Sequence, residues 1–220
     1  MRVCALIPAY NEAAAIKEII LQIRQQGLEV VVIDDGSSDS TGQIAASCGA
    51  IVLKNIKNEG KGASLNKGFA YCLENGFDAV IAMDGDGQHL PQDIPLFINA
   101  AQASDSGIIV GNRMSQARNM PLPRFLTNKF MSWLISLICK QKVPDTQCGF
   151  RLIKRAVLEK IKLKTSKFEV ESELLIAASR AGFKIESLPV KTVYGSEVSH
   201  INPLTDTVRF IKFILWTSRD

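Results

Sequence analysis

The stretch AVIAMDGDGQ spans residues 79–88 and joins an uninterrupted apolar run to a pair of aspartates. An apolar run of this length, stopped abruptly by acidic and glycine residues, is typical of a strand buried on both faces of a parallel sheet. Side chains alternate along extended backbone, so Asp84 and Asp86 are expected to point to the same side where the strand ends. Paired carboxylates with Gln88 beside them predict a site for a hard cation, Mg²⁺ or Mn²⁺.

The same order, an apolar run followed by polar residues, recurs through the first half of the chain. Short apolar runs at 3–7, 30–33 and 51–53 alternate with segments of helical periodicity, such as the stripe Ile16, Ile19, Ile20 and Ile23. The alternation predicts an α/β fold with a mostly parallel central sheet and helices on both faces. Ligands in such sheets bind beyond the carboxyl ends of the strands. The polar residues that follow Ile7, Ile33, Met83 and Val110 are therefore expected to meet in one cleft.

The second half of the chain is less regular. We expect an apolar helix at about Phe125 to Cys139, a loop from Asp145 to Arg151, a helix around Leu174, an edge strand at Leu188 to Val190, and a basic, aromatic amphipathic segment at the end. This organisation predicts one domain over residues 1–203 and a C-terminal amphipathic helix over residues 204–220.

Composition limits the class of protein. The 220 residues are 46% hydrophobic and 22% charged, with a net charge of +4, which suits one globular domain. The basic residues are scattered, so nucleic acid is not the expected partner. The five cysteines lack C-x-x-C spacing and indicate a reduced, cytoplasmic protein. No signal peptide is evident, and the longest nearly uncharged apolar run is shorter than the ~20 residues that span a bilayer.

Three familiar ligand-binding motifs are excluded. In a calcium-binding EF-hand loop counted from Asp84, His89 and Pro95 stand where Gly and Glu are required. A Walker phosphate loop around Gly60-Lys61-Gly62 lacks both its first glycine and its Ser or Thr. The first strand leads into Pro8 to Glu12 without a G-x-G-x-x-G motif, which disfavours a dinucleotide-binding oxidoreductase.

Three ordered motifs carry a family resemblance. The segments IPAYNE (7–12), VIDDGSSD (32–39) and DGDGQH (84–89) resemble family 2 glycosyltransferases of the GT-A fold. The similarity is greatest to the branch of dolichyl-phosphate mannose synthases and bacterial polyprenyl-phosphate glycosyltransferases. It extends over nearly the whole chain, including Gly111 to Arg113, Asp145 to Arg151 and the segment around Glu173. The resemblance implies a single Rossmann-like GT-A domain that uses a nucleoside-diphosphate sugar.

The resemblance also implies roles for individual residues. Pro8, Tyr10, Glu12 and Asp35 would line the nucleoside pocket, and Asp84, Asp86 and Gln88 would hold the metal ion that bridges the diphosphate. Arg113 and Arg124 match basic positions near the donor and acceptor phosphates, and with Asp86 they are the expected catalytic residues. Metal and arginines would neutralise the charge that the leaving nucleoside diphosphate gains.

The acceptor is the open part of the interpretation. A polyprenyl phosphate is already ionised and needs no strong general base, whereas a saccharide hydroxyl in cell-envelope or surface polysaccharide needs one. Glu171 and Glu173 are the candidate bases, with ordinary helix-surface charge as the alternative. The lipid-phosphate branch usually carries an Arg before a Tyr-Gly pair and a Ser-Lys after it; this chain has Lys191 and His200 nearby instead.

Further readings concern the reaction and the membrane. The Q-x-x-R-W motif of processive synthases is missing, so inverting transfer of a single sugar is expected. The alternative functions are those of a nucleotidyltransferase and of a catalytically inactive nucleotide-binding module. The helix from Phe125 to Cys139 is either a core helix or one that lies on the bilayer. Lys129, Trp133 and a tail with Arg209, Lys212 and Trp216 favour peripheral contact with the cytoplasmic face of a membrane.

Overall fold

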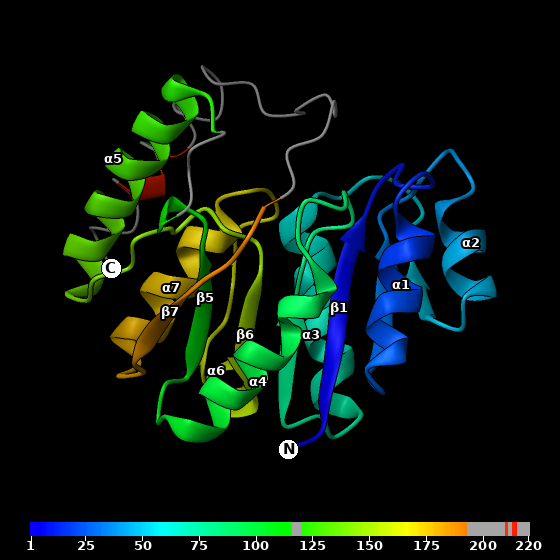
Figure 1. The fold of residues 1–220 in the computed structure, drawn as a ribbon, viewed down its shortest axis with the longest axis horizontal. Helices are drawn as coiled ribbons and strands as arrows, with labels where there is room; N and C mark the ends of the chain where they lie inside the picture. The colour runs from blue at the N-terminus through cyan, green and yellow to red at the C-terminus, as the bar shows by residue number, and fades with distance from the viewer. Residues whose placement is uncertain (116–119, 193–209, 211–212, 215–220) are drawn as a thin grey trace.

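A seven-stranded mixed sheet forms the centre of the computed structural model, which describes residues 1–115, 120–192, 210, 213 and 214 (Figure 1). The strand order is β3-β2-β1-β4-β6-β5-β7. Neighbouring strands pair in parallel except at β6, which is antiparallel to both β4 and β5. The strands are β1 Val3–Ala9, β2 Glu29–Asp34, β3 Ile51–Lys54, β4 Ala79–Ala82, β5 Ile108–Asn112, β6 Arg151–Lys154 and β7 Ile185–Pro189.

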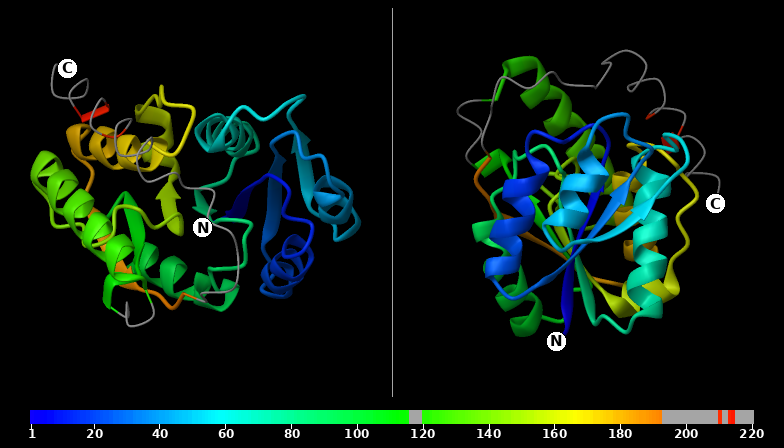
Figure 2. Two further views of the ribbon diagram at one scale, coloured as in Figure 1. Left: turned by 90° about the horizontal axis from the view of Figure 1, so that it is seen from above. Right: turned by 90° about the vertical axis from the view of Figure 1, so that its right-hand side faces the viewer.

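Helices cover both faces of this sheet (Figure 2). The helix α3 packs with α6 and α7 on one face, and α1 and α4 lie on the other. The helices are α1 Ile16–Gln25, α2 Thr41–Ser47, α3 Lys61–Glu74, the 3₁₀ turn η1 Pro91–Asp93, α4 Ile94–Ala103, α5 Leu122–Cys139, α6 Arg155–Lys160 and α7 Val170–Arg180. The predicted α/β class with a mostly parallel sheet is therefore confirmed.

The predicted elements of the first half coincide with the observed ones because their apolar residues are buried. The stripe Ile16, Ile19, Ile20 and Ile23 faces the core, as its spacing predicts. The residues of β1 are buried along almost the whole strand, because β2 and β4 flank it and helices cover both its faces. The predicted edge position near Leu188 is also correct, since β7 ends the sheet.

Strand β6 was not predicted, and its antiparallel direction determines where the loop before it lies. Its sequence, Arg151 to Lys154, begins and ends with a cation, and Arg151 is nevertheless buried. Running antiparallel to β4, β6 begins opposite Ala82, at the edge of the sheet where β4 ends. The preceding loop, Asp145 to Gly149, is therefore brought beside the acidic motif.

Helix α5 has two distinct faces. Asn128, Ser132, Ile135 and Cys139 are buried, while large apolar side chains on the other face are exposed. The helix packs against α7 and lies at the opposite end of the molecule from α1 and α2 (Figure 1). Among the described residues, no helix combines the length and the apolar character that crossing a membrane requires.

The predicted helix over residues 204–220 falls almost entirely outside the described residues. Only Phe210, Phe213 and Ile214 are described there, in helical conformation, and the two phenylalanines are buried. The proposed division into residues 1–203 and 204–220 therefore stays a prediction.

Candidate active site

The carboxyl ends of β1, β2, β4 and β5 lie at one edge of the sheet. The parallel register of β1 with β2 and β4 places these ends side by side, and β6, antiparallel to β4 and β5, makes those two strands parallel to each other. The polar segments that follow Ala9, Asp34, Ala82 and Asn112 therefore leave the sheet at the same edge. The convergence predicted from the sequence is confirmed at the level of the backbone.

The acidic pair lies directly beyond β4, but in a turn and not in extended backbone. The strand ends at Ala82, a turn begins at Gly85, and Gly87 has a φ of 76°. The expectation of extended backbone through both carboxylates is thus wrong, because a turn, which needs glycine at its left-handed position, begins between them. The backbone N–H of Gln88 donates to Oδ1 of Asp86 at 3.0 Å, which stabilises this turn.

Asp84 is the more strongly paired of the two carboxylates. Its Oδ1 lies 2.5 Å from Nζ of Lys61, and its Oδ2 lies 3.6 Å from Nε2 of the buried His89. Burial by itself raises the pKa of Asp84, but the positive charge of Lys61 and the contact with His89 hold that pKa well below its usual range. Asp84 is therefore an anion at neutral pH, as a metal ligand has to be.

Asp86 has a different electrostatic environment. The ion pairs among the described residues include none that involves Asp86. Burial and the neighbouring charge of Asp84 raise the pKa of Asp86 above its usual value. A half-buried carboxylate that lacks a cation and repels its neighbour is suited to a divalent ion, which would relieve both costs. The donor set of Asp84, Asp86 and the Gln88 amide fits Mg²⁺ or Mn²⁺ completed by other oxygen ligands.

The residues predicted to line the nucleoside pocket surround the ends of β1 and β2. Tyr10 is 41% exposed and offers its ring at the sheet edge. The backbone of Glu12 is fixed by hydrogen bonds: its N–H donates to Oγ1 of Thr41 at 2.8 Å, and its carbonyl accepts the N–H groups of Ala15 and Ile16, where α1 begins. Pro8 lies in β1 beside Ile33. These three residues occupy positions consistent with a nucleoside site, which remains a prediction.

Asp35 has a structural task that its motif did not reveal. Its carboxylate accepts hydrogen bonds from Nδ2 of Asn55 at 2.8 Å and from the backbone N–H groups of Glu59 and Gly60, both at 2.9 Å. The side chain is buried. Asp35 thereby fixes the turn that leads into α3 and its first residue, Lys61.

The two predicted arginines lie in different settings. Arg113 follows β5 and is buried, and its guanidinium pairs with both oxygens of Asp145. Arg124 lies in the first turn of α5 and is half-buried. Arg113 therefore holds the loop that begins at Asp145 in place. Direct contact of either arginine with a phosphate stays a prediction.

Glu171 and Glu173, at the start of α7, are buried, so the reading of them as surface helix charges is wrong. Glu171 pairs with Lys61 through Oε1 and with Nη2 of Arg151 through Oε2, the latter at 3.1 Å. The carboxylate of Glu173 accepts the backbone N–H groups of Lys164 and Thr165, each at 2.8 Å. Both carboxylates are already occupied by partners within the protein.

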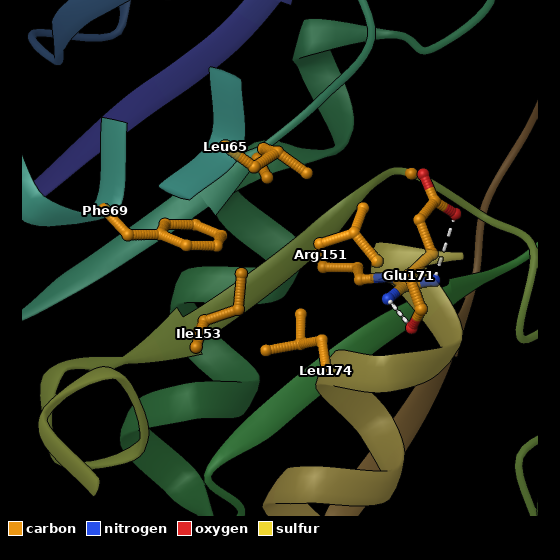
Figure 3. Close-up of a pocket in the computed structure, with 9 residues that line it drawn as sticks. Leu65, Phe69, Arg151, Ile153, Glu171 and Leu174 are labelled. Carbon is orange, nitrogen blue, oxygen red and sulfur yellow. Dashed lines mark hydrogen bonds and ion pairs between the residues drawn. The ribbon is translucent and has the colours of Figure 1, made fainter. Parts of the chain in front are cut away.

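The sequence predicted no role in the site for Lys61 or Arg151, and it predicted the loop from Asp145 to Arg151 without its position beside the acidic motif. A Cβ atom on Gly149 would lie 2.5 Å from Oδ2 of Asp84, so only glycine lets this loop approach the acidic motif. Beside the Arg151–Glu171 pair, Leu65, Phe69, Ile153 and Leu174 face a small apolar hollow (Figure 3). The Gly60-Lys61-Gly62 segment is the sequence feature that could have drawn attention to Lys61, but its only interpretation was the excluded Walker loop.

Comparisons with known proteins agree with this geometry. Residues 4–162 match the glycosyl transferase family 2 domain. The chain is 29% identical to a UDP-N-acetylglucosamine–dolichyl-phosphate N-acetylglucosaminyltransferase from Methanococcus voltae, over 86% of this chain and 84% of that protein. It is also 29% identical to an undecaprenyl-phosphate mannosyltransferase from Micrococcus luteus, over 88% of this chain and 84% of the relative.

The fold has counterparts among solved structures. Glucosyl-3-phosphoglycerate synthase from Mycobacterium tuberculosis, crystallised with Mn²⁺, UDP and phosphoglyceric acid, superposes with a TM-score of 0.73 at 21% identity, covering 94% of this chain and 74% of that one. At this identity the likeness concerns the fold alone. With a sheet edge that gathers the three motifs and a match over residues 4–162, this chain belongs to glycosyl transferase family 2 and is a glycosyltransferase.

Proposed function

We propose that the protein transfers a single sugar, with inversion, from a UDP- or GDP-linked donor to a polyprenyl phosphate at a membrane surface, in a metal-dependent reaction. The observation that carries the donor half of this proposal is the acidic pair beyond β4: Asp84 is held ionised, and Asp86 has no cation partner among the described residues. Relatives named as transferases to dolichyl and undecaprenyl phosphates support the acceptor half.

The proposed donor site combines residues that lie at the ends of β1, β2 and β4. Asp84, Asp86 and the amide of Gln88 would hold Mg²⁺ or Mn²⁺, which when bound neutralises charge on the departing diphosphate. Tyr10 presents its ring for stacking on the base, beside Pro8 and Glu12. Asp35 acts on the donor through the turn that it fixes, because its carboxylate is already saturated by Asn55, Glu59 and Gly60.

The state of the two buried glutamates favours a phosphate acceptor over a hydroxyl acceptor. Deprotonating a sugar hydroxyl requires a base that is free to accept a proton. Glu171 is paired with Lys61 and Arg151, and Glu173 holds the backbone at Lys164 and Thr165. An acceptor that arrives ionised, as a polyprenyl phosphate does, needs neither carboxylate. The positions of Arg113 and Arg124 near the donor and acceptor phosphates are part of this proposal.

The exposed face of α5 supports contact with a bilayer. Along one side of this helix, large apolar side chains are more than half exposed: Leu122, Leu126, Phe130, Trp133 and Leu137. A stripe of this kind on a helix too polar to cross a membrane is typical of a helix that lies in the interface. We propose that this face rests on the cytoplasmic leaflet, where the lipid acceptor is held, and that residues 204–220 add a second contact.

The test is a transfer assay with defined components. The purified chain is incubated with Mg²⁺ or Mn²⁺, each of a panel of UDP- and GDP-sugars, and vesicles containing polyprenyl phosphate, and the lipid fraction is analysed for glycolipid by mass spectrometry. A parallel reaction offers saccharide acceptors in place of the lipid. Glycolipid from one donor is the expected result, whereas transfer to saccharides alone would contradict the proposed acceptor.

A further inference from the structure

Lys61 occupies a place between two carboxylates from distant parts of the chain. It is the first residue of α3, and its Nζ contacts Oδ1 of Asp84, at 2.5 Å, and Oε1 of Glu171. Only 16% of its side chain is exposed. An ammonium in this position is the cation that balances Asp84 when no divalent ion is bound.

If Lys61 moves away, Asp84 and Glu171 keep different partners. Glu171 keeps a second cation, because Arg151 pairs with its other oxygen. Arg151 is itself fixed by the carbonyl oxygens of Cys148, Thr146 and Glu171, at 2.7, 2.8 and 2.6 Å. Among the residues that the structure describes, Asp84 then keeps only His89, whose Nε2 lies 3.6 Å from its Oδ2. A second positive charge that approaches Asp84 therefore competes with Lys61, while Glu171 retains a partner throughout.

The backbone under Lys61 is anchored on both sides, so the exchange involves the side chain alone. Asp35 holds the N–H of Gly60, and the N–H groups of Gly62 and Ala63 both donate to the carbonyl of Ser166, at 2.9 and 3.2 Å. A Cβ at Gly60 would lie 2.5 Å from the same carbonyl. Four flexible methylene groups of a lysine can move the ammonium while this frame stays in place.

The surroundings strengthen the competition between charges. Arg151 and Glu171 line the same hollow as the apolar side chains Leu65, Phe69 and Leu174, so their ion pair is poorly screened by solvent (Figure 3). The three carboxylates Asp84, Asp86 and Glu171 outnumber the two cations Lys61 and Arg151 by one charge. Adding a divalent ion makes the net charge of this group positive, and the group then attracts the negatively charged oxygens of a nucleoside diphosphate.

We propose that Lys61 is a positioning residue that competes with the divalent metal for Asp84. It keeps metal affinity low until the nucleoside diphosphate is present and leaves Asp84 for Glu171 when the metal binds. This inference rests on the metal site of the proposed function and adds an order of events to it: the metal displaces Lys61 from Asp84 when the donor diphosphate is there to supply further oxygen ligands.

The test measures Mn²⁺ binding, by electron paramagnetic resonance of the free ion, with and without UDP or GDP. Lys61→Met is expected to bind Mn²⁺ alone about tenfold tighter than the unsubstituted chain or more, and to show a smaller gain on adding nucleotide. Lys61→Arg keeps the charge and is expected to stay within about threefold of the unsubstituted chain. Lys160→Met is the matched control: it removes one exposed lysine from α6, at the opposite edge of the sheet, and is expected to change nothing.

The outcomes separate the two claims. Equal Mn²⁺ affinity in Lys61→Met and the unsubstituted chain overturns the role of Lys61 and leaves the metal site intact. No Mn²⁺ binding in any variant, with or without nucleotide, overturns the metal site and the inference with it.

A measurement on the unsubstituted chain covers the case in which Lys61→Met does not fold. The buried ammonium of Lys61 is followed by NMR of ¹⁵N-lysine and assigned from its loss in Lys61→Arg. Its resonance is expected to shift when Mg²⁺ and nucleotide saturate the site. A resonance that does not move at saturation overturns the proposal.

Discussion

Arg113 donates hydrogen bonds from Nε and Nη2 to the two carboxylate oxygens of Asp145, at 2.8 and 3.0 Å. The backbone N–H of Arg113 donates to the same carboxylate at 3.0 Å. Both side chains are buried. This bidentate pair fastens the end of β5 to the loop that places Gly149 beside Asp84, so it links the two halves of the site.

Removing Asp145 is expected to destabilise the fold substantially. Asp145→Ala leaves the Arg113 guanidinium buried without a partner, which typically costs about 3–5 kcal/mol. The free energy of unfolding in urea measures this loss. Glu159→Ala is the matched control, because it removes a carboxylate from an exposed pair with Arg155 and is expected to cost about 1 kcal/mol or less. Equal losses in the two variants would contradict the buried pair.

The same pair predicts a direction for pH dependence. Burial alone raises the pKa of Asp145, but hydrogen bonds and charge from Arg113 hold that pKa below its usual value. A carboxyl whose pKa is lowered by folding contributes stability above its unfolded pKa, about 3.9, and loses it as the pH falls through the folded pKa. The stability difference between the unsubstituted chain and Asp145→Asn is therefore expected to be larger at neutral pH than in acid. A difference that grows on acidification has the opposite sign and contradicts this account.

Glu173→Gln distinguishes a structural carboxylate from a general base. Glu173 accepts backbone N–H groups at Lys164 and Thr165, so the change should lower the thermal midpoint. Turnover with polyprenyl phosphate is expected to stay within about tenfold, whereas loss of a general base costs about 10²–10⁴-fold. Activity and melting are measured on the same preparation. A loss of about 10²-fold or more with an unchanged midpoint would identify Glu173 as a general base and contradict its purely structural role.

Membrane contact through α5 is testable by sedimentation with vesicles. Phe130→Asp places a charge in the middle of the exposed stripe and is expected to reduce binding to anionic vesicles several-fold without altering the fold. Leu21→Asp makes the same change at an exposed leucine of α1, at the other end of the molecule, and is the control (Figure 1). If both variants bind as the unsubstituted chain does, this face is not the membrane contact.

The sequence predicts the first half of the fold well because each element there carries its own pattern. The strand and helix around Val3 to Gln25 follow from apolar runs and helical spacing alone, and the acidic pair marks the sheet edge where ligands bind. The second half depends on charges whose partners are distant in sequence. Strand β6 begins with a buried Arg151, and burial of an arginine is evident only once Glu171 and three carbonyl groups surround it.

The site shows the same division. Asp84 and Asp86 stand out because two carboxylates after an apolar run need a cation. Lys61 does not stand out, because a lysine in a glycine-rich turn resembles any solvated loop residue, and its partners lie 23 and 110 positions away. The backbone turns between the two acids, so the periodicity argument, which assumes extended backbone, does not apply there.

In the function that we propose, Asp84 and Asp86 hold the metal ion that sugar transfer to a polyprenyl phosphate requires. The most direct measurement compares glycolipid formation by the unsubstituted chain and Asp86→Ala, with the preferred donor and saturating Mn²⁺, and repeats both after chelation. Transfer by the unsubstituted chain that stops on chelation and returns with Mn²⁺, together with a loss of at least about 10²-fold in Asp86→Ala, is the predicted result. Full activity of Asp86→Ala, or transfer that survives chelation, would contradict it.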